Sequence, residues 1–277
     1  MSKLPVLNIF TNFSAAVFQR DVIAGAREVF DNCGYQTAII EVTTTPTSLA
    51  DLPIERDLAG ALIITSVLPD AVIGELHHQK VPISLVSHQM AHIPGVMPNN
   101  RQGIAMLMEH LVVAHGRKRP VFIMGYMTQT DGIQRTAAFE QEVMRYNLNV
   151  PPAFYLRGDF SPEVAAESMM QFLSFDPDFD AVVASDYLMA EAAMQVIKAS
   201  GRRVPEDVAI VAFGDGPEAA QAGITTVAAD ITELGRRAAR QLLGQIEGLR
   251  IRGLTLLSTE LIKRETTANR AKVSTGK

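Results

Sequence analysis

The stretch Ala181–Phe213, AVVASDYLMAEAAMQVIKASGRRVPEDVAIVAF, decides the fold class. It opens on a short run of small and β-branched residues, AVVAS, and closes on a second one, VAIVAF from Val208. The segment between the two runs is amphipathic with a helical period. Two strands buried on both faces and joined by a helix form a right-handed crossover in a parallel sheet. The stretch therefore predicts an α/β fold.

The same alternation continues outward over most of the chain. Helices are predicted at 101–114, where Ile104, Met108 and Leu111 line one face, and at 231–246. Six more strands are predicted: VLNIF from Val6, TAIIEV from Thr37, GALIIT from Gly60, ISLV from Ile83, VFIMG from Val121 and AFYL from Ala153. A β-α-β-α order of this length indicates two parallel sheets.

Composition limits the classes of protein that fit. A chain of 277 residues with 47% hydrophobic and 20% charged residues is globular and long enough for two lobes. The formal net charge of −5 gives no overall attraction to phosphate polymers or anionic membranes. Binding of nucleic acid by this chain alone is therefore disfavoured.

Motifs for a metal, a cofactor or catalysis are missing from the sequence. The single cysteine, Cys33, cannot form an internal disulfide, so a reducing cytoplasm is the expected compartment. His88 and His92 have a spacing of four, but Pro94 and Gly95 follow at once, which disfavours a helical metal pair. The sequence has no nucleophile elbow, no Walker loop, no signal peptide and no run of membrane-spanning length. We expect no catalytic residues, no metal, no cofactor and no membrane contact.

Polar residues follow four of the predicted strands. Open parallel sheets place their ligand crevice at this edge. Helix N-capping or turn formation explains each pair equally well when it is taken alone. Together they predict a polar binding cleft formed by Thr65-Ser66, Ser87-His88, Ser185-Asp186 and Gly214-Asp215.

The last third of the chain carries a resemblance to a known family. From Ala181 to Gly248 it resembles the effector-binding core of the lac-repressor and galactose-repressor (LacI/GalR) family of bacterial transcription regulators. The matching pieces are SDYLMAEAAM, VPEDV from Val204, AFGD from Ala212, TTV from Thr225 and LGRRAA from Leu234. Upstream, NNRQG from Asn99 resembles the family's Asp-Asn-Arg-x-Gly, and RTAAF from Arg135 resembles its Arg-Leu-Ala-Gly-Phe.

This resemblance implies a periplasmic-binding-protein-like fold of type I, with two Rossmann-like lobes and a small effector held between them. We assign residues 4–117 plus 225–251 to the N-terminal lobe and 118–224 plus 252–266 to the C-terminal lobe, with a tail at 267–277. The resemblance also implies a homodimer. Ala71, Val72 and Leu76 offer an apolar helical face for it, unless that face only covers its own sheet.

Site residues follow from the resemblance position by position. Arg135 and Asp215 would contact the ligand, and both suit hydroxyl-rich molecules. Without the motif, Arg135 reads as an exposed helix cation. Ser185 stands where the family has Asn, and the sequence has no Trp to stack on a sugar, which leaves Phe18 or Tyr187, although Phe18 fits a core role equally well. The remaining candidates are Asp186, Ala15, Thr65, Ser66, His88 and Gln102.

The expected function is ligand sensing for transcription regulation, with a sugar, sugar acid or nucleoside as effector. Val6 already lies in the first strand, so the sequence holds no helix-turn-helix, and operator DNA would be bound by a domain outside it. An enzyme is not expected. The alternatives are a solute-binding protein of a transporter and the sensor module of a signalling protein.

Overall fold

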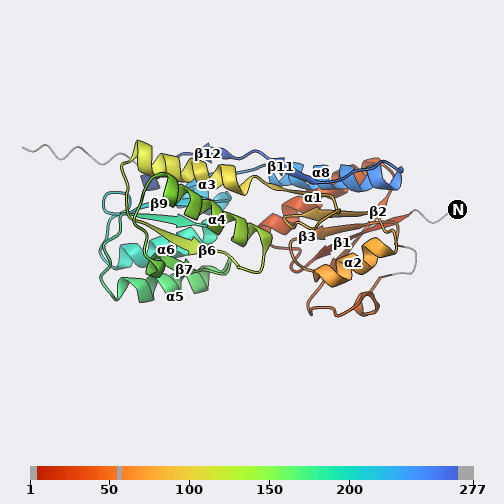
Figure 1. Ribbon diagram of the computed structural model, residues 1–277, viewed down its shortest axis with the longest axis horizontal. Helices are drawn as coiled ribbons and strands as arrows, with labels where there is room; N and C mark the ends of the chain where they lie inside the picture. The colour runs from red at the N-terminus through yellow and green to blue at the C-terminus, as the bar shows by residue number, and fades with distance from the viewer. Residues whose placement is uncertain (1–4, 55–57, 268–277) are drawn as a thin grey trace, which may run out of the picture. The chain divides into compact units, whose positions relative to one another are not determined.

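In the computed structural model, which describes residues 5–54 and 58–267, the chain divides into two compact units (Figure 1). Unit 1 comprises the chain up to Pro98 together with 230–257, and unit 2 comprises 99–229 together with the chain from Ser258 onward. Each unit is built on one six-stranded sheet with helices. Within the described ranges, no helix has both the length and the apolar character needed to cross a bilayer.

The sheet of unit 1 has the strand order β11-β5-β4-β3-β1-β2, and every neighbouring pair is parallel. Its strands are β1 (Val6–Thr11), β2 (Gln36–Glu41), β3 (Ala61–Ile64), β4 (Ile83–Val86), β5 (Gly95–Pro98) and β11 (Leu254–Leu257). Its helices are α1 (Val17–Asn32), the short 3-10 turn η1 (Leu49–Asp51), α2 (Asp70–His78) and α8 (Ile231–Ile246).

Unit 2 repeats this plan with the order β12-β10-β9-β8-β6-β7, in which β12 alone is antiparallel. Its strands are β6 (Pro120–Met124), β7 (Tyr155–Arg157), β8 (Ala181–Ala184), β9 (Ala209–Phe213), β10 (Thr225–Ala228) and β12 (Glu260–Ile262). Its helices are α3 (Asn100–Glu109) with the π-helical turn η2 (His110–Ala114), α4 (Thr130–Arg145), η3 (Pro152–Phe154), α5 (Pro162–Leu173), α6 (Tyr187–Ala199), α7 (Pro217–Gln221) and η4 (Glu265–Thr267).

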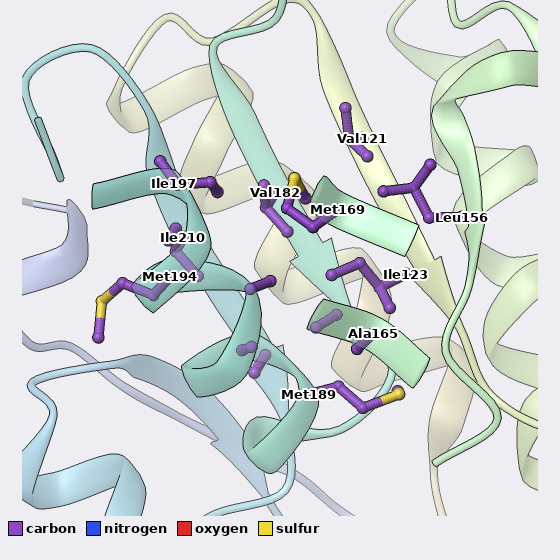
Figure 2. Close-up of a cluster of buried hydrophobic side chains, with 14 of the residues drawn as sticks. Val121, Ile123, Leu156, Ala165, Met169, Val182, Met189, Met194, Ile197 and Ile210 are labelled. Atoms are coloured by element: carbon purple, nitrogen blue, oxygen red, sulfur yellow. The ribbon is translucent and has the colours of Figure 1, made fainter. Parts of the chain in front are cut away.

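Both faces of the unit 2 sheet are buried, as the continuous apolar strands predict. Val121 and Ile123 of β6 point into a core under α5 and α6, shown in Figure 2, whereas Phe122 between them packs with α3 and α4. Neighbouring strands alternate in the same way, since Val182 joins the first core and Val183 the second. The fold class expected from the sequence is thus confirmed.

All eight predicted strands are present, and the helix predicted at 231–246 is α8. The prediction did not include β5, whose sequence GVMP ends in a proline that strand patterns disfavour. It also missed β10 in unit 2 and β11, which pairs with β5 in unit 1. These short strands owe their conformation to pairing in the sheet.

Helix α3 belongs to unit 2, whereas residues 99–117 were predicted to lie in the N-terminal lobe. Gly103 lies directly on the ring of Phe213, so that a Cβ on Gly103 would be only 2.4 Å from the ring atom Cε2. Ile104 and Leu107 are fully buried in the core that α3 shares with α4. Periodicity identifies such a helix, but it does not identify the sheet on which the helix packs.

The apolar face of α2 covers its own sheet. Val72 and Leu76 are buried against Phe10 in the core of unit 1, and only Ala71 of the three is exposed. The prediction of a dimer surface on this face is therefore wrong. The alternative reading, in which the face packs inside its own lobe, is confirmed.

His110 in η2 ties the C-terminal segment to unit 2. Its Nε2 lies 2.9 Å from the hydroxyl of Thr267, and its ring packs edge-on against His115 with 4.5 Å between the ring centroids. Burial, followed by the nearby His115 and Lys263, lowers the pKa of His110 to about 4. The folded protein therefore favours the neutral imidazole.

The free energy of unfolding should fall in mild acid. The reason is that His110 binds a proton in the unfolded state but stays neutral in the folded state. The contribution of the neutral His110 to the free energy of unfolding is complete above the ordinary histidine pKa. It is lost as the pH falls from about 6.5 toward 4. Between pH 8 and pH 5 the loss at this site should be about 2 kcal/mol. Urea unfolding at both pH values tests it. His110→Gln should reduce the difference by that amount and the exposed His78→Gln should not, and equal pH dependence in both variants would refute the assignment.

Candidate functional site

The carboxyl ends of β6, β8 and β9 meet at one edge of the unit 2 sheet, because these strands are neighbours and parallel. Ser185 and Asp186 follow β8, and Gly214 and Asp215 follow β9. Arg135 reaches the same edge from α4, which follows β6. The fold of unit 2 thus brings together four of the predicted site residues, Arg135, Ser185, Asp186 and Asp215.

Arg135 is the centre of a buried polar cluster. Its Nε donates to Oδ1 of Asn100 at 2.8 Å, and its Nη1 donates to the backbone carbonyl of Ser185 at 2.7 Å. Its Nη2 lies 3.4 Å from Oδ2 of Asp131, one helical turn earlier. Asn100 in turn donates to Oδ1 of Asp131 at 2.8 Å. Arg135 is only 7% exposed, so its reading as a solvated helix cation is wrong.

Aromatic rings lie on the Arg135 guanidinium. Its carbon Cζ is 3.8 Å from the ring centroid of Phe213 and 5.8 Å from that of Phe160. Burial lowers the pKa of Arg135, and the nearby Asp131 and Asp186 oppose that shift. These two carboxylates balance the buried cation, whose planar fork is held in one orientation.

Asp186 caps α6, as the N-capping alternative foresaw. Its Oδ1 accepts from the backbone N–H of Leu188 at 2.8 Å. Burial raises the pKa of Asp186, against the effect of these backbone hydrogen bonds and of Arg135. The neighbouring Ser185 is fully buried, and its Oγ has no hydrogen-bond partner among the residues that the structure describes. A buried hydroxyl without a partner is an acceptor and donor available to a ligand or a water.

Asp215 forms an ion pair that no pattern in the sequence predicts. Its two oxygens accept from Nη1 and Nη2 of Arg264 at 2.8 and 2.9 Å, and Oδ1 also accepts from the Thr226 hydroxyl at 2.9 Å. Burial raises the pKa of Asp215, but the bonds from Arg264 and Thr226 outweigh it and hold that pKa below its usual value. Arg264 lies 49 residues further along the chain, so only the folded sheet reveals the pair.

Of the two aromatic rings beside Arg135, Phe160 is the partly exposed one. Its ring centroid lies 6.3 Å from that of Tyr126 in the loop after β6, and both rings are at least partly exposed. Tyr187, one of the two rings considered for stacking, is instead buried in the core under α5 and α6, so that prediction is wrong. Its side chain lies against Gly216, where a Cβ would be 2.6 Å from the Tyr187 hydroxyl. No sequence motif singled out Phe160.

The corresponding edge of unit 1 carries hydroxyl groups. Thr65 and Ser66 follow β3, and Ser87 and His88 follow the neighbouring β4. Ser66 Oγ lies 3.3 Å from Nδ1 of His88, whose Nε2 lies 2.8 Å from Oδ1 of Asp70. Thr65, at a φ of 59°, donates its hydroxyl hydrogen to the carbonyl of Ile64 at 2.6 Å.

The last three predicted site residues are Phe18, Ala15 and Gln102. Phe18 is half-buried in the first turn of α1, and Ala15 is exposed just before that helix. Gln102 in α3 uses its side-chain oxygen to accept from the backbone N–H of Thr259 at 3.2 Å. In the described ranges, no group of three or more His, Cys, Asp and Glu side chains could hold a metal ion.

The sequence of this chain is similar to those of known proteins. Residues 108–267 match the family described as the periplasmic binding protein-like domain. The regulator CelR of Thermobifida fusca is 31% identical over 188 residues, which are 66% of this chain and 54% of CelR. The repressor CytR of Escherichia coli K12 is 29% identical over 260 residues, 90% of this chain and 75% of CytR. The chain spans about half the length of CelR in this match.

Solved structures show the same fold. A CelR–cellobiose complex covers 96% of this chain, and 86% of the CelR chain is matched, with a TM-score of 0.83 at 24% identity. The lac repressor dimer bound to operator and the anti-inducer ONPF covers 96% of this chain, and 95% of the repressor chain is matched, with a TM-score of 0.85 at 23% identity. At these identities the likeness concerns the fold alone.

Proposed function

Because this chain belongs to the family of periplasmic binding protein-like domains found in LacI-type regulators, we propose that it senses a small, hydroxyl-rich metabolite and thereby controls a transcription regulator. The observation that carries the proposal is the Arg135 cluster at the carboxyl edge of the unit 2 sheet. Its guanidinium, two carboxylates and the buried Ser185 hydroxyl offer both donors and acceptors.

The charge balance of the site favours a neutral ligand. Arg135 is offset by Asp131 and Asp186, and Arg264 is paired with Asp215. An added carboxylate on the ligand would therefore find no uncompensated cation among these groups. The partly exposed ring of Phe160 supports a ligand with a flat apolar face, such as a pyranose or a nucleobase. Among sugars, sugar acids and nucleosides, we favour neutral sugars and nucleosides.

Operator DNA and a second copy of the chain are the proposed macromolecular partners. The relatives CelR and CytR are named as transcriptional regulators, and the lac repressor with the same fold is a dimer on its operator. With a net charge of −5, this chain does not attract DNA by itself, so a separate domain would bind it. We place the regulator in the cytoplasm. Binding without chemical turnover is proposed, and the transporter and signalling alternatives are not favoured.

A thermal-shift screen of the purified chain tests the proposal. The panel contains glucose, galactose, cellobiose, gluconate, cytidine and adenosine. A ligand at a hundred times its dissociation constant should raise the unfolding free energy by about 2.7 kcal/mol, because it binds only the folded state. At least one neutral compound should raise Tm, and chromatography should recover it unchanged. Turnover of the compound, or no shift with any member, would contradict the proposal.

Two phenylalanines of unit 2 provide a matched pair of variants. Phe160→Ala removes the ring beside Arg135 and should weaken binding of the best compound roughly tenfold, the worth of one stacking contact plus its buried area. Phe175→Ala removes a ring that is 78% exposed and should leave the dissociation constant unchanged. Isothermal titration calorimetry measures both.

A further inference from the structure

Strand β11 leaves one edge of the unit 1 sheet open. It stands at the end of the strand order and pairs only with β5 in the described ranges. The N–H of Gly95 in β5 donates to the carbonyl of Gly253 at 3.1 Å. In a parallel ladder this bond turns the backbone groups of Thr255 toward β5 as well, so those of Leu254 and Leu256 point outward. Apart from the pairing with β5, the described part of the chain forms no backbone hydrogen bond with these two leucines.

The two faces of β11 carry different side chains. Thr255 faces helix α8, because its hydroxyl accepts from Nε2 of Gln241 at 3.0 Å. Side chains alternate between the faces of a strand, so Leu254 and Leu256 lie on the face away from α8. Leu256 is 47% exposed. A strand added at this edge would therefore place alternate side chains next to α8 and the others next to the two leucines.

Two arginines of α8 lie on the side of that helix that borders β11. Gly235 of α8 faces α1, with which it is in close backbone contact. At about 100° per residue, Arg237 and Arg240 lie roughly 140–160° around the helix from Gly235, and Arg237 lies only about 40° from Gln241. Both arginines donate to the same oxygen of Glu233, at 3.1 and 3.2 Å. One carboxylate is thus shared by two cations, which leaves net positive charge above β11.

The loop between α8 and β11 carries two more arginines, Arg250 and Arg252. Both are exposed, and neither has an ion-pair partner among the residues that the structure describes. The loop folds back on the last turn of α8, since the N–H of Leu249 donates to the carbonyl of Gly244 at 2.8 Å. Gly244 follows Arg240 by one helical turn, so the loop arginines and the helix arginines are close together. We call these four residues the basic patch: Arg237, Arg240, Arg250 and Arg252.

We propose that the β11 edge captures an extended acidic segment of a partner protein, which adds to the sheet as a further strand. The outward N–H and C=O groups of β11 supply main-chain hydrogen bonds. Carboxylates on one face of the added strand meet the basic patch, and apolar side chains on its other face lie next to Leu254 and Leu256. The segment that fits best therefore alternates acidic and apolar residues. This surface goes beyond the proposed sensing function and does not involve the metabolite.

Peptide binding to the whole chain tests the proposal. The probe is the fluorescein-labelled peptide EVEIEVE, and fluorescence anisotropy follows its titration at low salt. It should bind saturably, and more weakly as salt is added. The peptide EEVIVEE has the same composition without the alternation and should bind at least tenfold more weakly, and KVKIKVK should not bind. Equal binding of EVEIEVE and EEVIVEE would show that charge alone acts, and no binding of EVEIEVE would show that the arginines only guard the edge; either result overturns the proposal.

Charge reversal identifies the surface. The double variant Arg250→Glu/Arg252→Glu should raise the dissociation constant for EVEIEVE roughly tenfold or more, because two attractive pairs become repulsive. The double variant Arg27→Glu/Lys198→Glu makes the same change in net charge at exposed positions on α1 and α6 and should bind as the wild type does. Urea unfolding checks that both variants are folded. Equal dissociation constants for the two double variants would overturn the proposal.

Amide hydrogen exchange, measured by NMR on the wild type, locates the bound peptide. EVEIEVE should slow exchange at the outward N–H groups of Leu254 and Leu256, whereas the N–H of Thr255, which faces β5, should change little. Strand β2, at the opposite edge of the same sheet, is the control and should not change. Unchanged exchange at both leucines in the presence of bound peptide would overturn the proposal.

Two other occupants would be recognised in the same measurements. If a short DNA duplex binds more tightly than EVEIEVE and loses affinity in Arg250→Glu/Arg252→Glu, the basic patch serves phosphates and the proposal is wrong. If Leu254 and Leu256 become protected without peptide as the protein concentration rises, the edge belongs to a second copy of the chain, which also overturns the proposal. Failure of the metabolite screen leaves all of these outcomes unchanged, so the two proposals are tested separately.

Discussion

Replacing Gly235 with alanine should strongly destabilise unit 1. Helices α1 and α8 cross there in direct backbone contact. A Cβ on Gly235 would lie 2.0 Å from the carbonyl oxygen of Val22, and a Cβ on Gly25 would lie 2.0 Å from that of Thr232. Backbone cannot rotate away as a side chain can, so the two helices must separate and open the core between them.

The expected loss for Gly235→Ala is about 3 kcal/mol of unfolding free energy, the upper end for overpacking, even after the helix-propensity gain of about 1 kcal/mol. Gly74→Ala in α2 is the matched control, because nothing lies within 4 Å of a Cβ there. That change should stabilise the protein by about 0.5–1 kcal/mol. Urea unfolding followed by circular dichroism compares them. A Gly235 variant as stable as the wild type would show that the helices do not cross this closely.

Replacing Arg135 with methionine should weaken the fold as well as ligand binding. Methionine fills much of the same volume but leaves Asp131, Asn100 and the Ser185 carbonyl without their charged donor. Removing one partner of a buried ion pair typically costs about 3–5 kcal/mol, because the other charge stays buried and unpaired. We expect a loss in this range for unit 2.

Arg145→Met is the control for the same change on the same helix. Arg145 pairs with Glu142 at 3.1 Å, but its side chain is 58% exposed, so the pair is screened and worth little. Its loss should change the unfolding free energy by less than about 0.5 kcal/mol. Equal effects of the two substitutions in chemical unfolding would mean that the Arg135 cluster does not stabilise unit 2.

The positions of the site residues along the chain were predictable, and their partners were not. Ser185 and Asp186 could be placed at a strand end from the AVVAS run alone, and the capping role of Asp186 follows from its place before a helix. The ring that we propose for stacking was not predictable. Tyr187 is turned into the core because it lies on the inner face of α6, whereas Phe160 reaches Arg135 from the loop after β7.

The ion pair and the chain of polar contacts show the same difference between predictable positions and unpredictable partners. Asp215 and Arg264 are 49 residues apart, and Ser66 and His88 are 22 residues apart. No local pattern links either pair, since each depends on which strands become neighbours in a sheet. The assignment of α3 to unit 2 was likewise missed, because its amphipathic period would suit either sheet.

The sequence by itself determined most of the strands, most of the helices and their β-α-β order, because short-range alternation of apolar and polar residues selects the local backbone conformation. Tertiary structure alone decided that Arg135 is buried between Phe213 and Phe160, that Asp215 is held by Arg264, and that His88 joins Ser66 to Asp70. The physical reason is the distance along the chain over which each effect acts. A side chain's conformational preference acts over a few residues, whereas its hydrogen-bond partners are set by the packing of strands and helices that are distant in the chain.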